Sequence, residues 1–244
     1  MISRIKTINQ NPKGFTLLEL LIVISIIAIL SVALIFVLNP AETLKKSRDA
    51  QRISDLATLK SALGVYTTST TTPYLGGVSS NTTCKTGTGG GTYGASSKVY
   101  YSVSTANTIT DTAFDMGSGS TPSAGQVSVT ANTLTDGTGW IPVNFDSLIG
   151  GSPISNLPID PINTVTVAST TGILATASVS PDYVYRYACN GDSLTYEIDA
   201  ILESSTYTTG AGNKMTTDGG NSNNYYEVGT NLKILGMGTN NFDY

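Results

Sequence analysis

The hydrophobic residues of the chain are concentrated near its N-terminus. Residues 15–38 read FTLLELLIVISIIAILSVALIFVL and contain one charged side chain, Glu19. A helix over these residues is about 36 Å long at 1.5 Å per residue, enough to cross a hydrocarbon core of roughly 30 Å. The pattern therefore predicts a membrane-spanning helix, with the basic residues before it on the cytoplasmic side and the body of the chain outside.

A second helix is predicted to begin directly after the apolar one. Asn39 is a good N-cap, Pro40 suits the first helical position, and Glu42 can complete a capping box. We therefore expect an interruption at Leu38–Asn39 and an amphipathic helix over residues 39–66. Its apolar face, expected to pack on a β-sheet, is formed by Ile53, Leu56, Leu59, Leu63 and Tyr66.

Charged side chains gather in the first half of this second helix. They are Lys45, Lys46, Arg48, Asp49, Arg52 and Asp55. One interpretation is a solvated helix face with intrahelical pairs such as Lys45–Asp49. The other is contact with lipid headgroups, and later with acidic neighbours on other chains. The sequence leaves both open.

The clearest β-pattern lies near the C-terminus. Residues 183–189 and 194–202 are strand-like, and Asn190-Gly191-Asp192 between them is a strong hairpin signal. The side chains of the second strand alternate between two faces. One face, expected to lie against the helix, is formed by Ile198, Ala200 and Leu202. The other face is formed by Glu197, Asp199 and Ile201. These features predict an α+β fold in which the amphipathic helix packs on an antiparallel β-sheet.

Residues 67–244 are predicted to form a β-rich globular head. Its first part, residues 67–139, is rich in Thr, Ser and Gly, which indicates a long connection with short strands such as 98–104 and 126–130. This region either recognises a ligand or only keeps an exposed face soluble. Two shorter signals are present. Asn81-Thr82-Thr83 matches the N-glycosylation pattern, and Leu157–Pro161 is predicted to form a rigid proline turn.

Composition narrows the possible functions. Charged residues make up 12% and aromatic residues 8%, which suits an exported β-rich domain better than a cytosolic enzyme. The chain has no histidine, which excludes Ser-His-Asp and Cys-His catalysis, histidine-ligated zinc or haem, and a histidine base. The chain after residue 14 is acidic, so nucleic acid is not expected as a partner. We expect no enzymatic activity.

Glu19 is the residue that a plain membrane anchor does not explain. A carboxylate in mid-membrane costs roughly 2.5–3.5 kcal/mol, less near a helix end, and calls for a partner. Cleavage after Gly14 would make Phe15 the N-terminus, and its amine would lie one helical turn from Glu19. In a staggered stack of chains this amine could pair with its own or a neighbour's Glu19 and so set the register, because unpaired charges in an apolar core are costly.

Residues 13–22, KGFTLLELLI, closely resemble the prepilin motif of type IV pilins and type II secretion pseudopilins. The resemblance implies that prepilin peptidase cleaves after Gly14, the last residue of a leader over residues 1–14, and methylates Phe15. It also makes Glu19 the assembly glutamate and implies the pilin fold, with residues 67–139 as the most variable part. Unlike many relatives, the chain has no proline within the apolar helix.

The resemblance implies a structural subunit of a type IV pilus-like filament. Its partners would be copies of itself, prepilin peptidase, an inner-membrane assembly platform and, before assembly, the membrane. The single-pass precursor would lie in the cytoplasmic membrane and later in an extracellular filament or a periplasmic pseudopilus. The alternatives are a type II secretion pseudopilin and a minor tip pilin or adhesin. A secretory signal is disfavoured because no small-residue cleavage site follows Leu38.

Two further features remain open at the level of sequence. Cys84 and Cys189 suit a disulfide in an exported protein, but two separate buried thiols fit as well. Asp218 opens the acidic turn Asp218-Gly219-Gly220-Asn221. Major pseudopilins bind Ca²⁺ near their C-terminal loops, which makes this turn a weak Ca²⁺ candidate. The turn lacks regular D-x-D-x-D spacing, so an ordinary turn without a cofactor is the preferred interpretation.

Overall fold

The computed structural model describes residues 14–88, 96–102, 133–163 and 183–235. The chain forms two compact units, Met1–Thr43 and Leu44–Tyr244. The predicted leader, residues 1–14, lies outside the described residues except for Gly14, as does the expected strand 126–130.

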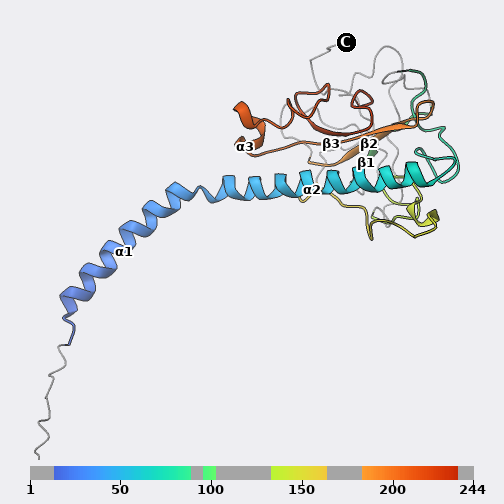
Figure 1. The fold of residues 1–244 in the computed structure, drawn as a ribbon. Coiled ribbons are helices and arrows are strands. Elements are labelled where there is room, and N and C mark those ends of the chain that lie inside the picture. The colour runs from blue at the N-terminus through green and yellow to red at the C-terminus, as the bar shows by residue number, and fades with distance from the viewer. Residues whose placement is uncertain (1–13, 89–95, 103–132, 164–182, 236–244) are drawn as a thin grey trace, which may run out of the picture. The chain divides into compact units, whose positions relative to one another are not determined.

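Helix α1 comprises Leu17–Leu38, and its segment Leu17–Leu34 is long and apolar enough to cross a membrane (Figure 1). The described side chains of this segment are exposed, as expected of a helix whose apolar surroundings lie outside the chain. The helix ends at Asn39, which has a left-handed φ of 38°. Asparagine tolerates this conformation better than most residues, so the predicted interruption at Leu38–Asn39 is confirmed.

Helix α2 comprises Pro40–Ser69 and extends three residues beyond its predicted end. Its start is held as predicted, because the backbone N–H of Glu42 donates to Oδ1 of Asn39 at 3.4 Å. Four of the five residues of the predicted apolar face are buried, and the fifth, Ile53, is half-buried. The buried ones are Leu56, Leu59, Leu63 and Tyr66.

The sheet has four antiparallel strands in the order β1-β2-β3-β4. They are β1 Tyr100–Tyr101, β2 Arg186–Asn190, β3 Thr195–Ala200 and β4 Tyr226–Gly229. The predicted hairpin forms β2 and β3, whereas the expected strand 98–104 is reduced to the two residues of β1. Figure 1 shows α2 lying along the sheet. The predicted α+β fold is confirmed.

The core lies between α2 and one face of the sheet. Tyr187, Ile198 and Ala200 point into it and are completely buried. Trp140, Val143 and Phe145 join the same core from the segment that precedes the proline turn. The opposite face of the sheet is also buried, because Glu197 and Asp199 are completely inaccessible to solvent. The sheet is therefore covered on both sides.

Cys84 and Cys189 form a disulfide across a sequence separation of 105 residues. The bond joins the connection after α2 to strand β2. Backbone hydrogen bonds reinforce it on both sides: Lys85 N–H donates to Cys189 O at 2.8 Å, and Gly191 N–H donates to Lys85 O at 2.9 Å. The loop that the bond closes carries much of the core, so its closure restricts the unfolded chain.

Replacing Cys84 and Cys189 together by Ser is expected to lower the free energy of unfolding by about 4–5 kcal/mol, the chain-entropy cost of opening a loop of this size. Denaturant titration of the full chain in detergent micelles measures this loss. Alkylation and intact mass of the native wild type provide the control. Two alkylatable thiols in the wild type would contradict the bond.

Candidate functional site

The bond between Gly14 and Phe15 lies just before α1 and is accessible. Both residues are exposed, Phe15 to 88%. No atom lies within 4 Å of the position that a Cβ on Gly14 would occupy. Among the described residues beyond its chain neighbours, no side chain lies against Gly14, so the described fold leaves room for a larger residue there.

Glu19 and Thr16 form a capping box at the start of α1. Oε2 of Glu19 accepts hydrogen bonds from the backbone N–H of Thr16 at 2.9 Å and from its hydroxyl at 2.8 Å. In return, the backbone N–H of Glu19 donates to Oγ1 of Thr16 at 3.2 Å. The carboxylate is thus held over the first turn, where free N–H groups and the helix dipole favour negative charge.

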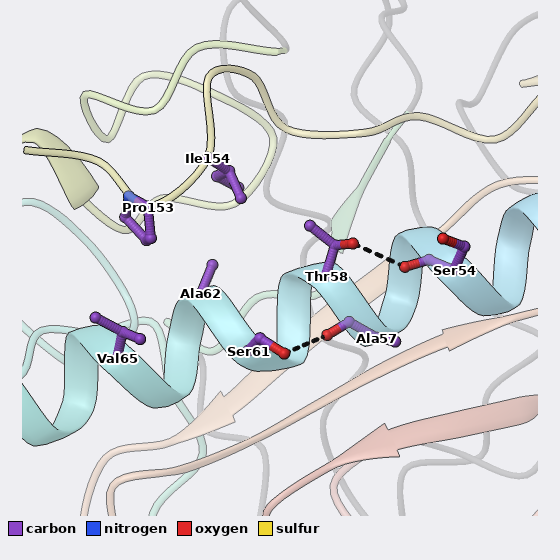
Figure 2. Close-up of a pocket in the computed structure, with 8 residues that line it drawn as sticks. All are labelled: Ser54, Ala57, Thr58, Ser61, Ala62, Val65, Pro153 and Ile154. Carbon is purple, nitrogen blue, oxygen red and sulfur yellow. Dashed lines mark hydrogen bonds between the residues drawn. The ribbon is translucent and has the colours of Figure 1, made fainter.

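Helix α2 and the loop that contains Pro153 and Ile154 line a hollow of about 370 Å³ (Figure 2). It is lined by Ser54, Ala57, Thr58, Ser61, Ala62, Val65, Pro153 and Ile154. The hydroxyls of Thr58 and Ser61 donate back to helix carbonyls, each at 2.9 Å, so they present little polarity to a ligand. None of the lining residues is charged, so the hollow lacks the acid, base or activated nucleophile of an active site. Most of its lining side chains are small, and Val65 and Ile154 are the larger apolar ones.

A buried ion cluster holds the first half of α2. The guanidinium of Arg52 donates to Asp160 at 2.6 and 3.0 Å, to Asp49 at 2.8 Å and to Glu203 at 2.7 Å. Glu203 also accepts two hydrogen bonds of 2.6 Å from Arg48. The cluster connects α2 to the proline turn that contains Asp160 and to the segment that follows β3.

This geometry corrects the interpretation of these charges as a solvated face. Asp49 and Arg52 are completely buried. Instead of pairing with Lys45, the carboxylate of Asp49 binds Arg52 and accepts the backbone N–H of Ser204 at 2.7 Å. Burial lowers the pKa of Arg52, but its carboxylate partners outweigh this and raise the pKa above its usual value, so Arg52 stays charged. Contact with lipid headgroups remains a prediction for Lys45 and Lys46.

The acidic turn at Asp218 has the geometry of an ordinary turn. Its carboxylate accepts the backbone N–H groups of Gly220 at 2.9 Å and Glu227 at 2.8 Å. Within the part of the chain that the structure describes, no three His, Cys, Asp or Glu side chains are grouped to hold a metal ion. Binding of Ca²⁺ at Asp218 stays a prediction.

The glycosylation pattern at Asn81 has a structural use. Oδ1 of Asn81 accepts the backbone N–H of Leu75 at 2.6 Å, and Nδ2 donates to Pro73 O at 3.0 Å. The amide that a glycan would modify therefore holds the loop after α2.

Sequence reasoning missed three features of the head. The ion pair between Arg52 and Asp160 spans 108 residues, and no local spacing signals it. The buried carboxylates Glu197 and Glu227 occupy strand positions that resemble an exposed polar face. Their proximity to a buried lysine, Lys85, depends on the path of the chain around the disulfide.

Comparison with known proteins gives one match. Residues 9–35 match the family model described as "Prokaryotic N-terminal methylation motif", the prepilin-type signal of type IV pilins and pseudopilins. The matched range includes Gly14, Phe15 and Glu19 and most of α1. No curated protein and no solved structure matches the chain. The recognition of this motif in the sequence is confirmed.

Replacing Arg52 by Met is expected to lower the free energy of unfolding by about 3–5 kcal/mol, because the substitution leaves buried carboxylates without their cation. Denaturant titration of the full chain in micelles measures the loss. Lys46→Met is the matched control: Lys46 is exposed on the same helix, and its removal is expected to change stability by less than about 0.5 kcal/mol. Equal losses in the two variants would show that the cluster does not hold α2.

Proposed function

We propose, on the premise that residues 9–35 are a prepilin-type signal, that this chain is the structural subunit of a type IV pilus-like surface filament. The signal itself marks a pilin- or pseudopilin-like processed protein, membrane-anchored as a precursor and of a structural kind. The observation that carries the proposal is the exposed apolar surface of α1 beside a carboxylate at its first turn.

The apolar surface of α1 needs a covering outside the membrane. The least exposed large apolar side chain of its described part, Ile22, is still 48% exposed. Outside lipid, water contact with such a surface costs about 25 cal/mol per Å². A bundle of identical helices supplies an apolar covering, so the partner that suits α1 best is a further copy of the same chain.

Glu19 gives this bundle a register. Once Phe15 is the N-terminus, its amine lies within one turn of a carboxylate that the capping box already orients. In a bundle core, each of the two charges is stable only when paired, so the pairing selects one axial position for each subunit. The methylation that the motif implies keeps this amine basic.

The hollow on α2 supports helix packing in the filament. Small side chains such as Ala57 and Ser61 let another helix approach closely, as small residues do at other helix interfaces. The chemistry of the hollow offers no alternative use as a catalytic site. The remaining partners in this proposal are prepilin peptidase and the membrane assembly platform.

The secretion pseudopilus is the alternative that shares these features. A tip adhesin would depend on the variable region, residues 67–139, much of which lies outside the described residues. A major pilin dominates the material sheared from the cell surface, whereas a pseudopilin or tip subunit does not. Abundance in that fraction therefore separates these functions.

Replacing Gly14 by Ala is expected to block leader removal, because the peptidase reads this residue while the fold tolerates a methyl group there. Mass spectrometry of the N-terminal peptide from native membranes is the measurement. The wild type is expected to begin at methylated Phe15 and the variant at Met1. A wild-type protein that retains Met1 on the surface would indicate a plain anchor and refute the filament proposal.

Glu19→Gln separates the charge of the side chain from its capping role. Glutamine also completes a capping box, so α1 and leader cleavage are expected to persist while filaments are lost. Thr16→Ala is the matched control, because it removes the cap, at a cost of about 1 kcal/mol, but keeps the carboxylate. Electron microscopy of sheared material is expected to show filaments for Thr16→Ala only. Filaments in the Glu19→Gln strain would rule out the ion pair.

A further inference from the structure

The face of the sheet that points away from α2 carries buried charged side chains. They are Arg186 on β2, Glu197 and Asp199 on β3, and Glu227 on β4, each at most 2% exposed. The C-terminal part of the chain covers them, and its last described residues, Ile234 and Leu235, are themselves buried. The function proposed above makes no use of this buried polar layer.

One of the carboxylates in this layer has a cation of its own. Arg186 donates to Asp199 through Nε at 2.7 Å and also through Nη2, and the ring of Tyr225 lies 3.8 Å from the guanidinium carbon. Arg186 and Asp199 thus neutralise each other, so this ion pair does not compensate the charge of the two glutamates.

Glu197 holds the C-terminal segment through one oxygen. Its Oε2 accepts the backbone N–H groups of Ile234 at 2.6 Å and Leu235 at 2.8 Å. The side chain of Glu197 is completely inaccessible to solvent, so water cannot bind its other oxygen, Oε1. Within the described ranges, Oε1 has no hydrogen-bond donor either. A buried carboxylate oxygen without a donor is costly, so this atom requires an explanation.

The carboxyl group of Glu227 supplies that explanation. Glu197 lies opposite Gly229 and Glu227 opposite Asp199, so the two glutamates are diagonal neighbours on the same face of the sheet. Each carboxyl group shifts the pKa of the other, so the two lie close enough to interact directly. An ionised carboxylate only accepts hydrogen bonds, so a hydrogen bond between the two glutamates can form only when one of them carries a proton.

The surroundings of the pair favour that proton. Lys85 faces it from the segment beside the disulfide, but its ammonium group donates to Ile234 O at 2.9 Å. Asp218 faces Glu227 from the turn before β4 and adds negative charge. Burial raises the pKa of Glu197 well above its usual value and that of Glu227 to about 7, and it lowers the pKa of Lys85 to about 8.

We propose that Glu197 and Glu227 share one proton in the folded protein, and that this proton keeps the segment Thr230–Leu235 on the sheet. When the proton leaves, two adjacent carboxylates are charged inside the protein. Withdrawal of the segment relieves this by opening the pair to water, at the loss of the hydrogen bonds to Glu197 and Lys85. The pair is a pH-dependent latch, and it operates whether or not the chain forms filaments.

The sign of the pH effect follows from the direction of the two pKa shifts. Both glutamates bind protons more tightly in the folded state, so their contribution to stability is complete below about pH 4.5. The part from Glu227 is lost as the pH rises through about 7, and the part from Glu197 is lost only well above its usual pKa. Lys85 acts in the opposite direction only above about pH 8. A window from pH 5 to 7.5 therefore isolates the glutamate pair from the lysine.

The test is thermal unfolding of the full chain in detergent micelles over this window. For the wild type we expect the Tm to fall by roughly 5 °C or more from pH 5 to pH 7.5. Glu197→Gln and Glu227→Gln each give the pair a permanent N–H donor, so both are expected to remove most of this fall. Other buried carboxyls with raised pKa, such as Asp55, maintain a smaller slope. Asp146→Asn, at an exposed carboxylate, is the control and is expected to retain the wild-type slope.

Two local measurements test the proton and the segment directly. Infrared spectra at pH 6 are expected to show a protonated carboxyl group in the wild type and to lose this signal in both glutamine variants. Hydrogen exchange at Ile234 and Leu235, corrected for the intrinsic rate, is expected to accelerate from pH 6 to pH 8 in the wild type but not in Glu197→Gln. Wild-type slopes in both glutamine variants, or equal protection at both pH values, would overturn the latch. Neither outcome bears on the filament, which is tested by Glu19→Gln.

Discussion

The guanidinium of Arg52 is the point at which three separate parts of the head are joined. It binds Asp49 on its own helix, Asp160 in the proline turn and Glu203 after β3. Apolar packing alone would let α2 slide along the sheet at modest cost, because one aliphatic contact replaces another. A buried cation between three carboxylates has no comparable second position, since any shift leaves charges unpaired. The axial position of α2 on the sheet, and with it the core between them, depends on this arrangement.

The two faces of the sheet obey different constraints. The face toward α2 is apolar and is stabilised by burial of residues such as Leu59 and Ile198. The other face places charged side chains beneath an irregular cover and is stabilised only while each charge has a partner or a proton. Stability of the first face is nearly independent of pH, whereas stability of the second face responds to pH. The sheet thus holds α2 on one face nearly independently of pH, whereas it holds the covering segment on the other face only while the buried charges have a partner or a proton.

Much of the fold could be predicted because its causes are local. The unbroken apolar run of α1, the Asn39-Pro40 restart, the helical spacing from Leu56 to Tyr66 and the Asn190-Gly191 turn each act over a few residues. The candidate processing site could be predicted equally well, because the residues of its motif are contiguous in the sequence. The buried charges could not be predicted. A charged residue at helical or strand spacing gives the same sequence pattern whether its side chain is solvated or paired with a distant residue. Only the folded chain brings Asp160 to Arg52, and Glu227 to Glu197.

In the filament proposed above, the disulfide would have a mechanical role. Tension that reaches Cys84 along the backbone can pass directly to Cys189 through the sulfur atoms, without stretching the 105-residue separation between them. The enclosed residues, which carry much of the core and include most of the variable region, then lie outside the covalent path of the force. Within this stretch, the variable region can lengthen, shorten or change sequence over evolution without weakening the covalent connection that carries the load.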